Sequence, residues 1–90
     1  MFVVCDCETN GLEDCSTIWC IVCKDIDTGE RYVFTPENLH TFRAFSSRVS
    51  CWIGHYFLGF DYHTINRILG CCIDPSKVID TLIVSRLANF

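Results

Sequence analysis

The stretch that decides the fold is Phe2-Val3-Val4-Cys5-Asp6-Cys7-Glu8, followed by the turn Thr9-Asn10-Gly11-Leu12. Its nearly continuous apolar run predicts a strand in the interior of a sheet. Because strand side chains alternate between faces, Asp6 and Glu8 point to the same side. Two carboxylates about 6–7 Å apart on one face repel each other. This pattern indicates a divalent cation between them, and the alternative is an exposed strand whose acids face water.

The composition indicates a small globular domain. The 90 residues are expected to form one domain, residues 1–90, and 50% of them are hydrophobic, which is enough for a core. No apolar run approaches the ~18 residues that span a bilayer, and the N-terminus has no basic region of the kind that begins a signal peptide. We therefore expect a cytoplasmic protein with no membrane segment.

Eight cysteines stand in this short chain. A disulfide scaffold requires a secretory route, which the sequence does not indicate. A zinc site is the sharper alternative, because Cys20 and Cys23 have C-x-x-C spacing. They lie in a β-like run, however, where positions i and i+3 face opposite sides. Reduced cysteines that fill the core are the better explanation.

The charge distribution limits how the chain could bind nucleic acid. The net charge is −4, and the seven Lys and Arg residues are scattered along the sequence. A protein that grips duplex DNA by counterion release normally has a basic stripe. Affinity for nucleic acid would therefore come from metals, base stacking or another polypeptide.

The pattern along the chain predicts the order β-β-β-α-β-α-β-α. The expected strands and helices are strands 2–8, 17–24, 31–35, 50–54 and 77–79, and helices 37–47, 61–70 and one running from residue 80 to residue 90. Gly29 in the hairpin turn and Gly70 after the second helix are expected to adopt positive φ. Tight turns make the first three strands antiparallel, and helical crossovers make the later ones parallel to the first. We thus predict an α/β fold, a mixed five-stranded sheet with flanking helices.

Asp61 is a third candidate acid, at the start of the helix predicted after the fourth strand. Taken alone, it is explained as a helix N-terminal acid that interacts with the helix dipole. If the first and fourth strands are neighbours and run in the same direction, however, Asp6, Glu8 and Asp61 converge at one edge of the sheet. Three carboxylates there suit the pair of divalent cations that drives phosphodiester hydrolysis.

Residues 6–12 (DCETNGL) resemble the first motif of the DEDD, or DnaQ-like, 3′–5′ exonucleases, D-x-E-T-x-G-L. Residues 53–61 (IGHYFLGFD) resemble their second motif, G-H-N-x-x-G-F-D. Residues 78–87 are similar to the segment that follows this motif in bacteriophage family-A DNA polymerases. The resemblance covers essentially the whole chain, in order.

This resemblance implies an RNase H-like fold and removal of nucleotides from single-stranded DNA 3′ ends with two Mg²⁺ or Mn²⁺ ions. Asp6 would bridge both ions, Glu8 would bind the first and Asp61 the second. The nucleic-acid contacts that it implies are Thr9, Asn10, Leu12, His55, Tyr56 and Phe60. Asp80 matches no metal ligand of the family, and we interpret it as a helix cap. A phage-encoded protein would act in the host cell cytoplasm.

The sequence departs from the family in two places. Tyr56 replaces the usual Asn of the second motif. The third motif, Y-x₃-D or H-x₄-D, supplies the last metal ligand and does not occur in these 90 residues: Asp61 is one residue too far from Tyr56, and His63 leads to Ile68. The chain therefore resembles the N-terminal part of the exonuclease domain, C-terminally truncated. We expect an exposed apolar patch on the sheet, and either a second polypeptide or self-association.

Three functional hypotheses remain open at this point. In the first, the chain is part of a 3′–5′ exonuclease completed by a partner. In the second, it is a catalytically inactive, exonuclease-like module that binds within a replication complex. A third and weaker hypothesis is a metal-sensing or cysteine-rich module.

Overall fold

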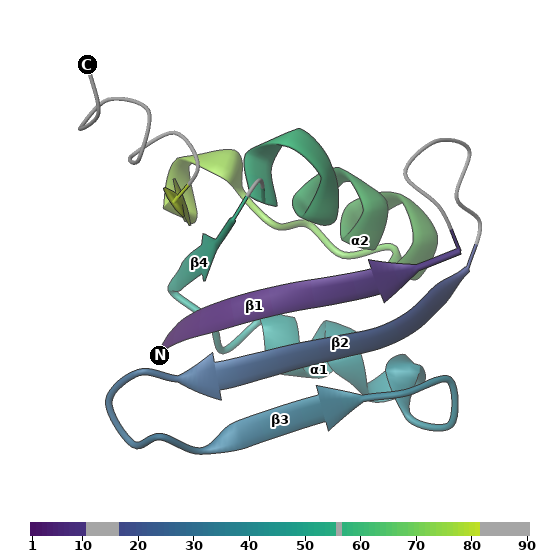
Figure 1. Cartoon of the computed structure of the whole chain (residues 1–90), viewed down its shortest axis with the longest axis horizontal. Coiled ribbons are helices and arrows are strands. Elements are labelled where there is room, and N and C mark those ends of the chain that lie inside the picture. The colour runs from purple at the N-terminus through teal and green to yellow at the C-terminus, as the bar shows by residue number, and fades with distance from the viewer. Residues whose placement is uncertain (11–16, 56, 82–90) are drawn as a thin grey trace.

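Five strands form one mixed sheet, in the order β3-β2-β1-β4-β5, in the computed structural model, which describes residues 1–10, 17–55 and 57–81 (Figure 1). The strands are β1 (Phe2–Thr9), β2 (Ile18–Asp25), β3 (Arg31–Phe34), β4 (Cys51–Gly54) and β5 (Val78–Asp80). Antiparallel pairing joins β1 to β2 and β2 to β3, whereas β4 is parallel to both β1 and β5. The predicted fold class, a mixed sheet of the RNase H-like type, is confirmed.

Two α-helices pack against the sheet, each preceded by a tighter or wider helical turn. They are α1 (Phe42–Ser46), after a 3₁₀ turn (Leu39–Thr41), and α2 (Tyr62–Leu69), after a π-helical turn (Phe57–Asp61); a further 3₁₀ turn (Pro75–Lys77) precedes β5. The first helix is shorter than the predicted 37–47. Residues 57–60 precede the predicted helix 61–70 and were expected in a loop, but they are helical as well. The helix predicted to run to residue 90 lies outside the described residues beyond Thr81.

The turns depend on a few specific residues. Gly29 has φ 76° in the hairpin, and Gly70 has φ 66° where α2 ends, so both glycines adopt the predicted positive φ. The buried carboxylate of Asp25 accepts hydrogen bonds from the backbone N–H groups of Asp27 (2.9 Å) and Thr28 (3.3 Å). These bonds satisfy two backbone donors at the tip of the hairpin that joins β2 to β3.

The core lies on one face of the sheet, and aromatic rings dominate it. Phe34 on β3 makes an edge-to-face contact with Phe42 on α1, at 4.9 Å between centroids. Trp52 on β4 stacks on Phe57 at 6.0 Å. Ile65 of α2 is fully buried against the same cluster. On α1, Phe42 and Phe45 are buried in this core, whereas Ala44 is exposed.

The opposite face carries no helix among the described residues, and Figure 1 shows α1 behind the sheet with the uncovered face toward the viewer. Strand pairing places several half-exposed apolar side chains on this uncovered face: Phe2 (46% exposed), Val4 (44%), Val33 (47%) and Ile79 (45%). The predicted apolar patch is therefore present.

Cysteines serve mainly as small core residues. Among the seven in the described segments, all are free thiols, and Cys5, Cys7, Cys23 and Cys71 are buried. Cys23 faces the core, and the side chain of Cys20 is directed to the other face, as strand alternation predicted. The pKa of the Cys5 thiol is raised by its hydrogen bond with Cys23, its cross-strand neighbour, and by burial.

Candidate functional site

Strand β1 presents the first two acids on the uncovered face. Its burial alternates strictly from Phe2 to Glu8, so that Cys5 and Cys7 are buried whereas Asp6 and Glu8 are exposed. Asp6 and Glu8 lie directly opposite Val22 and Cys20 of β2. The predicted orientation of the two carboxylates to the same side follows from this alternation.

The parallel pairing of β1 with β4 stops early and leaves room for a helix. Only Phe2–Val4 pair with Cys51–Ile53, and β4 ends at Gly54. There the chain turns back on itself so tightly that a Cβ on Gly54 would lie 2.9 Å from Cβ of Phe57 and 3.0 Å from the carbonyl oxygen of Cys5. Glycine is therefore required at this close approach. The π-helical turn that follows contacts β1, and Asp61 is its last residue.

Asp61 is buried beside the second half of β1. Its side chain accepts a hydrogen bond from the backbone N–H of Cys7, which favours the charged form. Burial has the larger, opposite effect and, with repulsion from Asp6 and then Glu8 and Asp80, raises the pKa of Asp61 from 3.8 to about 7. The structure thus brings the three predicted acids into mutual electrostatic range.

Asp61 lies at the start of α2, as expected, but its carboxylate does not cap the helix. The backbone of Asp61 is already helical, with φ −60° and ψ −47°, because the π-helical turn continues into α2. Its side chain makes no capping hydrogen bond. The carboxylate is instead turned toward β1, where it pays a desolvation cost that a helix terminus does not require.

Asp80 is a fourth acid of this group, although its sequence position predicted only a helix cap. It is the last residue of β5, is 4% exposed and pairs with Gly54 of β4. Its charge contributes to the raised pKa of Asp61. The predicted strand order could have placed Asp80 here, because the carboxyl ends of adjacent parallel strands meet at one edge of the sheet. The helix that Asp80 was predicted to cap lies outside the described residues.

The other predicted site residues differ in their position and exposure. Thr9 is half-buried at the end of β1, and the exposed Asn10 accepts a hydrogen bond at Oδ1 from the backbone N–H of Thr17 (3.3 Å). His55 is exposed after β4, with Nδ1 3.0 Å from Oγ1 of Thr81. Phe60 is half-buried in the π-helical turn. Leu12 and Tyr56 lie outside the described residues.

The donor set suits a hard cation, although its side chains are not gathered around one point. In residues 1–10, 17–55 and 57–81 no group of three or more His, Cys, Asp or Glu side chains has the spacing of a finished metal site. Asp6, Glu8 and Asp61 offer only carboxylate oxygens, the ligands that Mg²⁺ and Mn²⁺ prefer. Asp6 and Glu8 are exposed side chains on a strand, so their carboxylates can change rotamer toward a cation.

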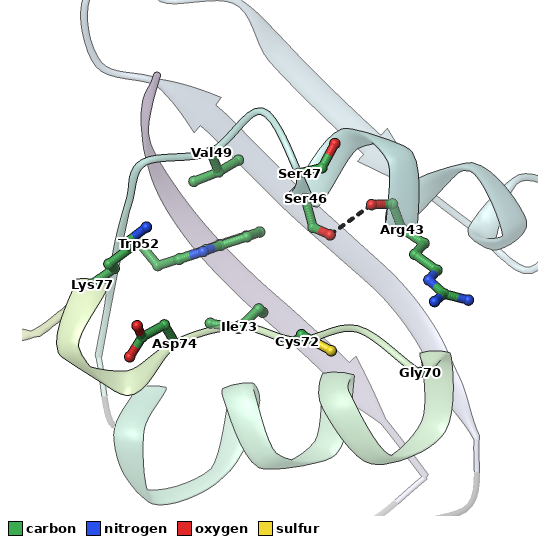
Figure 2. A pocket seen from close by; sticks show the side chains of 10 residues that line it. All are labelled: Arg43, Ser46, Ser47, Val49, Trp52, Gly70, Cys72, Ile73, Asp74 and Lys77. Atoms are coloured by element: carbon green, nitrogen blue, oxygen red, sulfur yellow. Dashed lines mark hydrogen bonds between the residues drawn. The ribbon is translucent and has the colours of Figure 1, made fainter.

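A separate cavity of about 360 Å³ lies away from these acids, between α1, β4 and the segment after α2 (Figure 2). Trp52 and Ile73 form its apolar part, whereas Arg43 and Lys77 supply its positive charges. The backbone beneath it is held by Asn66, which bonds both the N–H (2.8 Å) and the carbonyl (3.1 Å) of Ile73. None of the three predicted acids lines this cavity.

Among the described residues, no helix is long and apolar enough to cross a bilayer.

The sequence matches no protein-family model and no curated protein sequence. Solved structures do match, and one of them is the family B DNA polymerase from the hyperthermophilic archaeon Pyrobaculum calidifontis, with a TM-score of 0.68 and 14% sequence identity. The similarity covers 94% of this chain and 16% of the polymerase chain. At this identity the similarity shows a shared fold, one that occurs within a DNA polymerase.

Proposed function

We propose that this chain is part of a 3′–5′ exonuclease of the DEDD type that works with a DNA polymerase and shortens single-stranded DNA 3′ ends. The observation that carries the proposal is the acid group at the edge of β1, where the buried Asp61, with a pKa of about 7, lies within electrostatic range of Asp6 and Glu8. A fold that also occurs within a DNA polymerase supports the association with replication. The motif resemblance supports a phage family-A polymerase as the setting.

Asp6, Glu8 and Asp61 would hold two Mg²⁺ or Mn²⁺ ions. When bound, such ions activate a water and stabilise the charge that develops on the phosphate and the leaving oxygen. A cation also explains why the fold keeps Asp61 buried, because positive charge offsets the desolvation and the repulsion that raise its pKa. The exposed Asp6 and Glu8 would close on the ions, while the Cys7 N–H keeps the Asp61 carboxylate oriented.

Thr9, Asn10, Leu12, His55, Tyr56 and Phe60 would contact the 3′ terminal nucleotides. We further propose that a second polypeptide, or a second copy of this chain, supplies the ligand that the third motif provides elsewhere in the family. Removing one member of a group that acts as a unit lowers activity by several orders of magnitude. The isolated chain should therefore be a slow nuclease.

The test is degradation of a 5′-labelled single-stranded DNA by the purified chain with Mn²⁺, beside Asp6→Ala. The matched control is Asp27→Ala, which removes an exposed acid from the hairpin turn after β2. We expect a ladder that shortens from the 3′ end with the wild type and the control but not with Asp6→Ala. Mn²⁺ binding, followed by electron paramagnetic resonance, should be weakened by Asp6→Ala alone. A ladder that persists in Asp6→Ala refutes the proposal.

The uncovered sheet face favours a second candidate function, a non-catalytic module of a replication complex. Phe2, Val4, Val33 and Ile79 are all more than 40% exposed on one surface, which is typical of an interface. Tyr56 in place of the family's Asn is consistent with lost catalysis. A folded wild type that binds no Mn²⁺ and yields no ladder, even at high enzyme concentration, would favour this function.

A further inference from the structure

Trp19 is an exposed indole at an irregularity of β2. Side-chain alternation would place it on the same face as the buried Ile21. The register shifts, however, between Glu8 and Thr9: Glu8 pairs with Cys20 and Thr9 pairs with Ile18, so that Trp19 is an extra residue. As a result Ile18 is 2% exposed and Trp19 is 57% exposed. The bulge turns a large aromatic side chain out of the core.

This arrangement is costly for a domain of 90 residues, because tryptophan is among the side chains that contribute most to a core. Bulges are common beside active sites, where they redirect a side chain. Here the bulge faces the step from Glu8 to Thr9, immediately beside the acid group of the proposed site. The position of the irregularity therefore points to a binding role for the indole.

The negative charge beside Trp19 limits which interactions could hold a nucleic acid there. Asp6 and Glu8 repel phosphate unless a cation is bound, so a nucleic acid arriving here needs an attraction that does not depend on phosphate charge. Aromatic stacking supplies one, because every base has a π-face.

We propose that Trp19 stacks on a base of a single-stranded nucleic acid whose 3′ end lies at Asp6, Glu8 and Asp61. The inference rests on the proposed function for the position of the 3′ end. The stacking contact itself does not depend on hydrolysis. Trp19 is thus a positioning residue, which holds the strand while its end is at the acids.

The test uses fluorescence, since the chain has two tryptophans and the other one, Trp52, is buried. In a Trp52→Phe background, a short oligothymidine with phosphorothioate linkages, which resist hydrolysis, is titrated in Mn²⁺. We expect saturable quenching of Trp19. Trp19→Ala should weaken binding, measured by anisotropy of a labelled oligothymidine, about 5- to 150-fold, and Trp19→Phe should retain most of the affinity. Phe2→Ala, which removes an exposed aromatic ring at the other end of β1, is the control and should change the affinity less than about twofold.

The outcomes separate this inference from the proposed function. Quenching and a Trp19-dependent affinity without a ladder would support the stacking role and count against the nuclease. An Asp6-dependent ladder with unchanged affinity and KM in Trp19→Ala would overturn the stacking role and leave the nuclease intact. No quenching of Trp19 by the oligothymidine also overturns it, as does a Trp19→Ala phenotype confined to self-association.

Discussion

Replacing Asp61 with Asn should stabilise the chain at neutral and alkaline pH in the absence of metal ions. Asn has nearly the same shape, and its Oδ1 can still accept the hydrogen bond from the Cys7 N–H. What the substitution removes is a charge that burial and three neighbouring carboxylates disfavour. The stability gained therefore reports how unfavourable the ionised Asp61 is in the folded chain.

The sign and size of the effect follow from the pKa. The folded pKa of Asp61 is about 7, above its usual 3.8, so its contribution to stability is fully present below pH ~4 and is lost as pH rises to 7. At 1.36 kcal/mol per pH unit the full loss would be about 4 kcal/mol. Asp61 is 7% exposed, but its neighbours Asp6 and Glu8 face water, and solvent screening reduces our expectation to about 2 kcal/mol.

The assay is urea unfolding of wild type and Asp61→Asn in EDTA, at pH 5 and pH 8. At pH 8 the variant should be more stable by about 2 kcal/mol, a midpoint increase of roughly 1–2 M urea. At pH 5 the difference should fall below about 1 kcal/mol, because the wild-type carboxyl then holds its proton in the folded state. Asp27→Asn, an exposed acid of the hairpin, should show no such pH-dependent difference.

Equal or lower stability of Asp61→Asn at pH 8 would refute the reasoning, because it would mean that the folded protein does not penalise the charge. Adding Mn²⁺ in place of EDTA provides a second reading. A cation that binds only the folded state stabilises it by RT ln(1 + c/Kd), where c is the free cation concentration, so the gain increases with that concentration and with the affinity. The wild type should therefore gain stability on Mn²⁺ addition at pH 8, and Asp61→Asn should gain less.

Three further predictions concern packing, thiol reactivity and the uncovered face. Gly54→Ala should destabilise the chain by about 2 kcal/mol or more in urea unfolding, because its Cβ would lie 2.7 Å from Cδ2 of the fully buried Phe57; an unchanged midpoint would contradict this. Iodoacetamide should alkylate the exposed Cys72 in the native protein, whereas Cys5, buried and with a raised pKa, should react only on unfolding; equal rates by mass spectrometry would count against the core assignment. Val4→Lys should reduce self-association in light scattering and change stability by less than about 1 kcal/mol; an unaltered mass for an associating wild type would exclude the uncovered face as the contact.

Local pattern was enough for much of the fold. The apolar run of β1, the glycine at the hairpin and the glycine after α2 each act within a few residues, so strand positions and turn conformations follow from the sequence. Strand alternation likewise predicted that Asp6 and Glu8 share a face. Chain connectivity then predicted the parallel and antiparallel pairings, because tight turns and helical crossovers allow few arrangements.

Tertiary structure decided the features that depend on residues far apart in the chain. Asp61 looks like a helix N-terminal acid until the π-helical turn places it beside Cys7, and only burial together with Asp6, Glu8 and Asp80 raises its pKa. By strand alternation Trp19 would face the core, but the bulge in its pairing with β1 leaves it exposed. The physical reason is the same in both cases. Desolvation, charge repulsion and strand register depend on segments that meet only in the folded chain, and the spacing of residues in the sequence does not determine them.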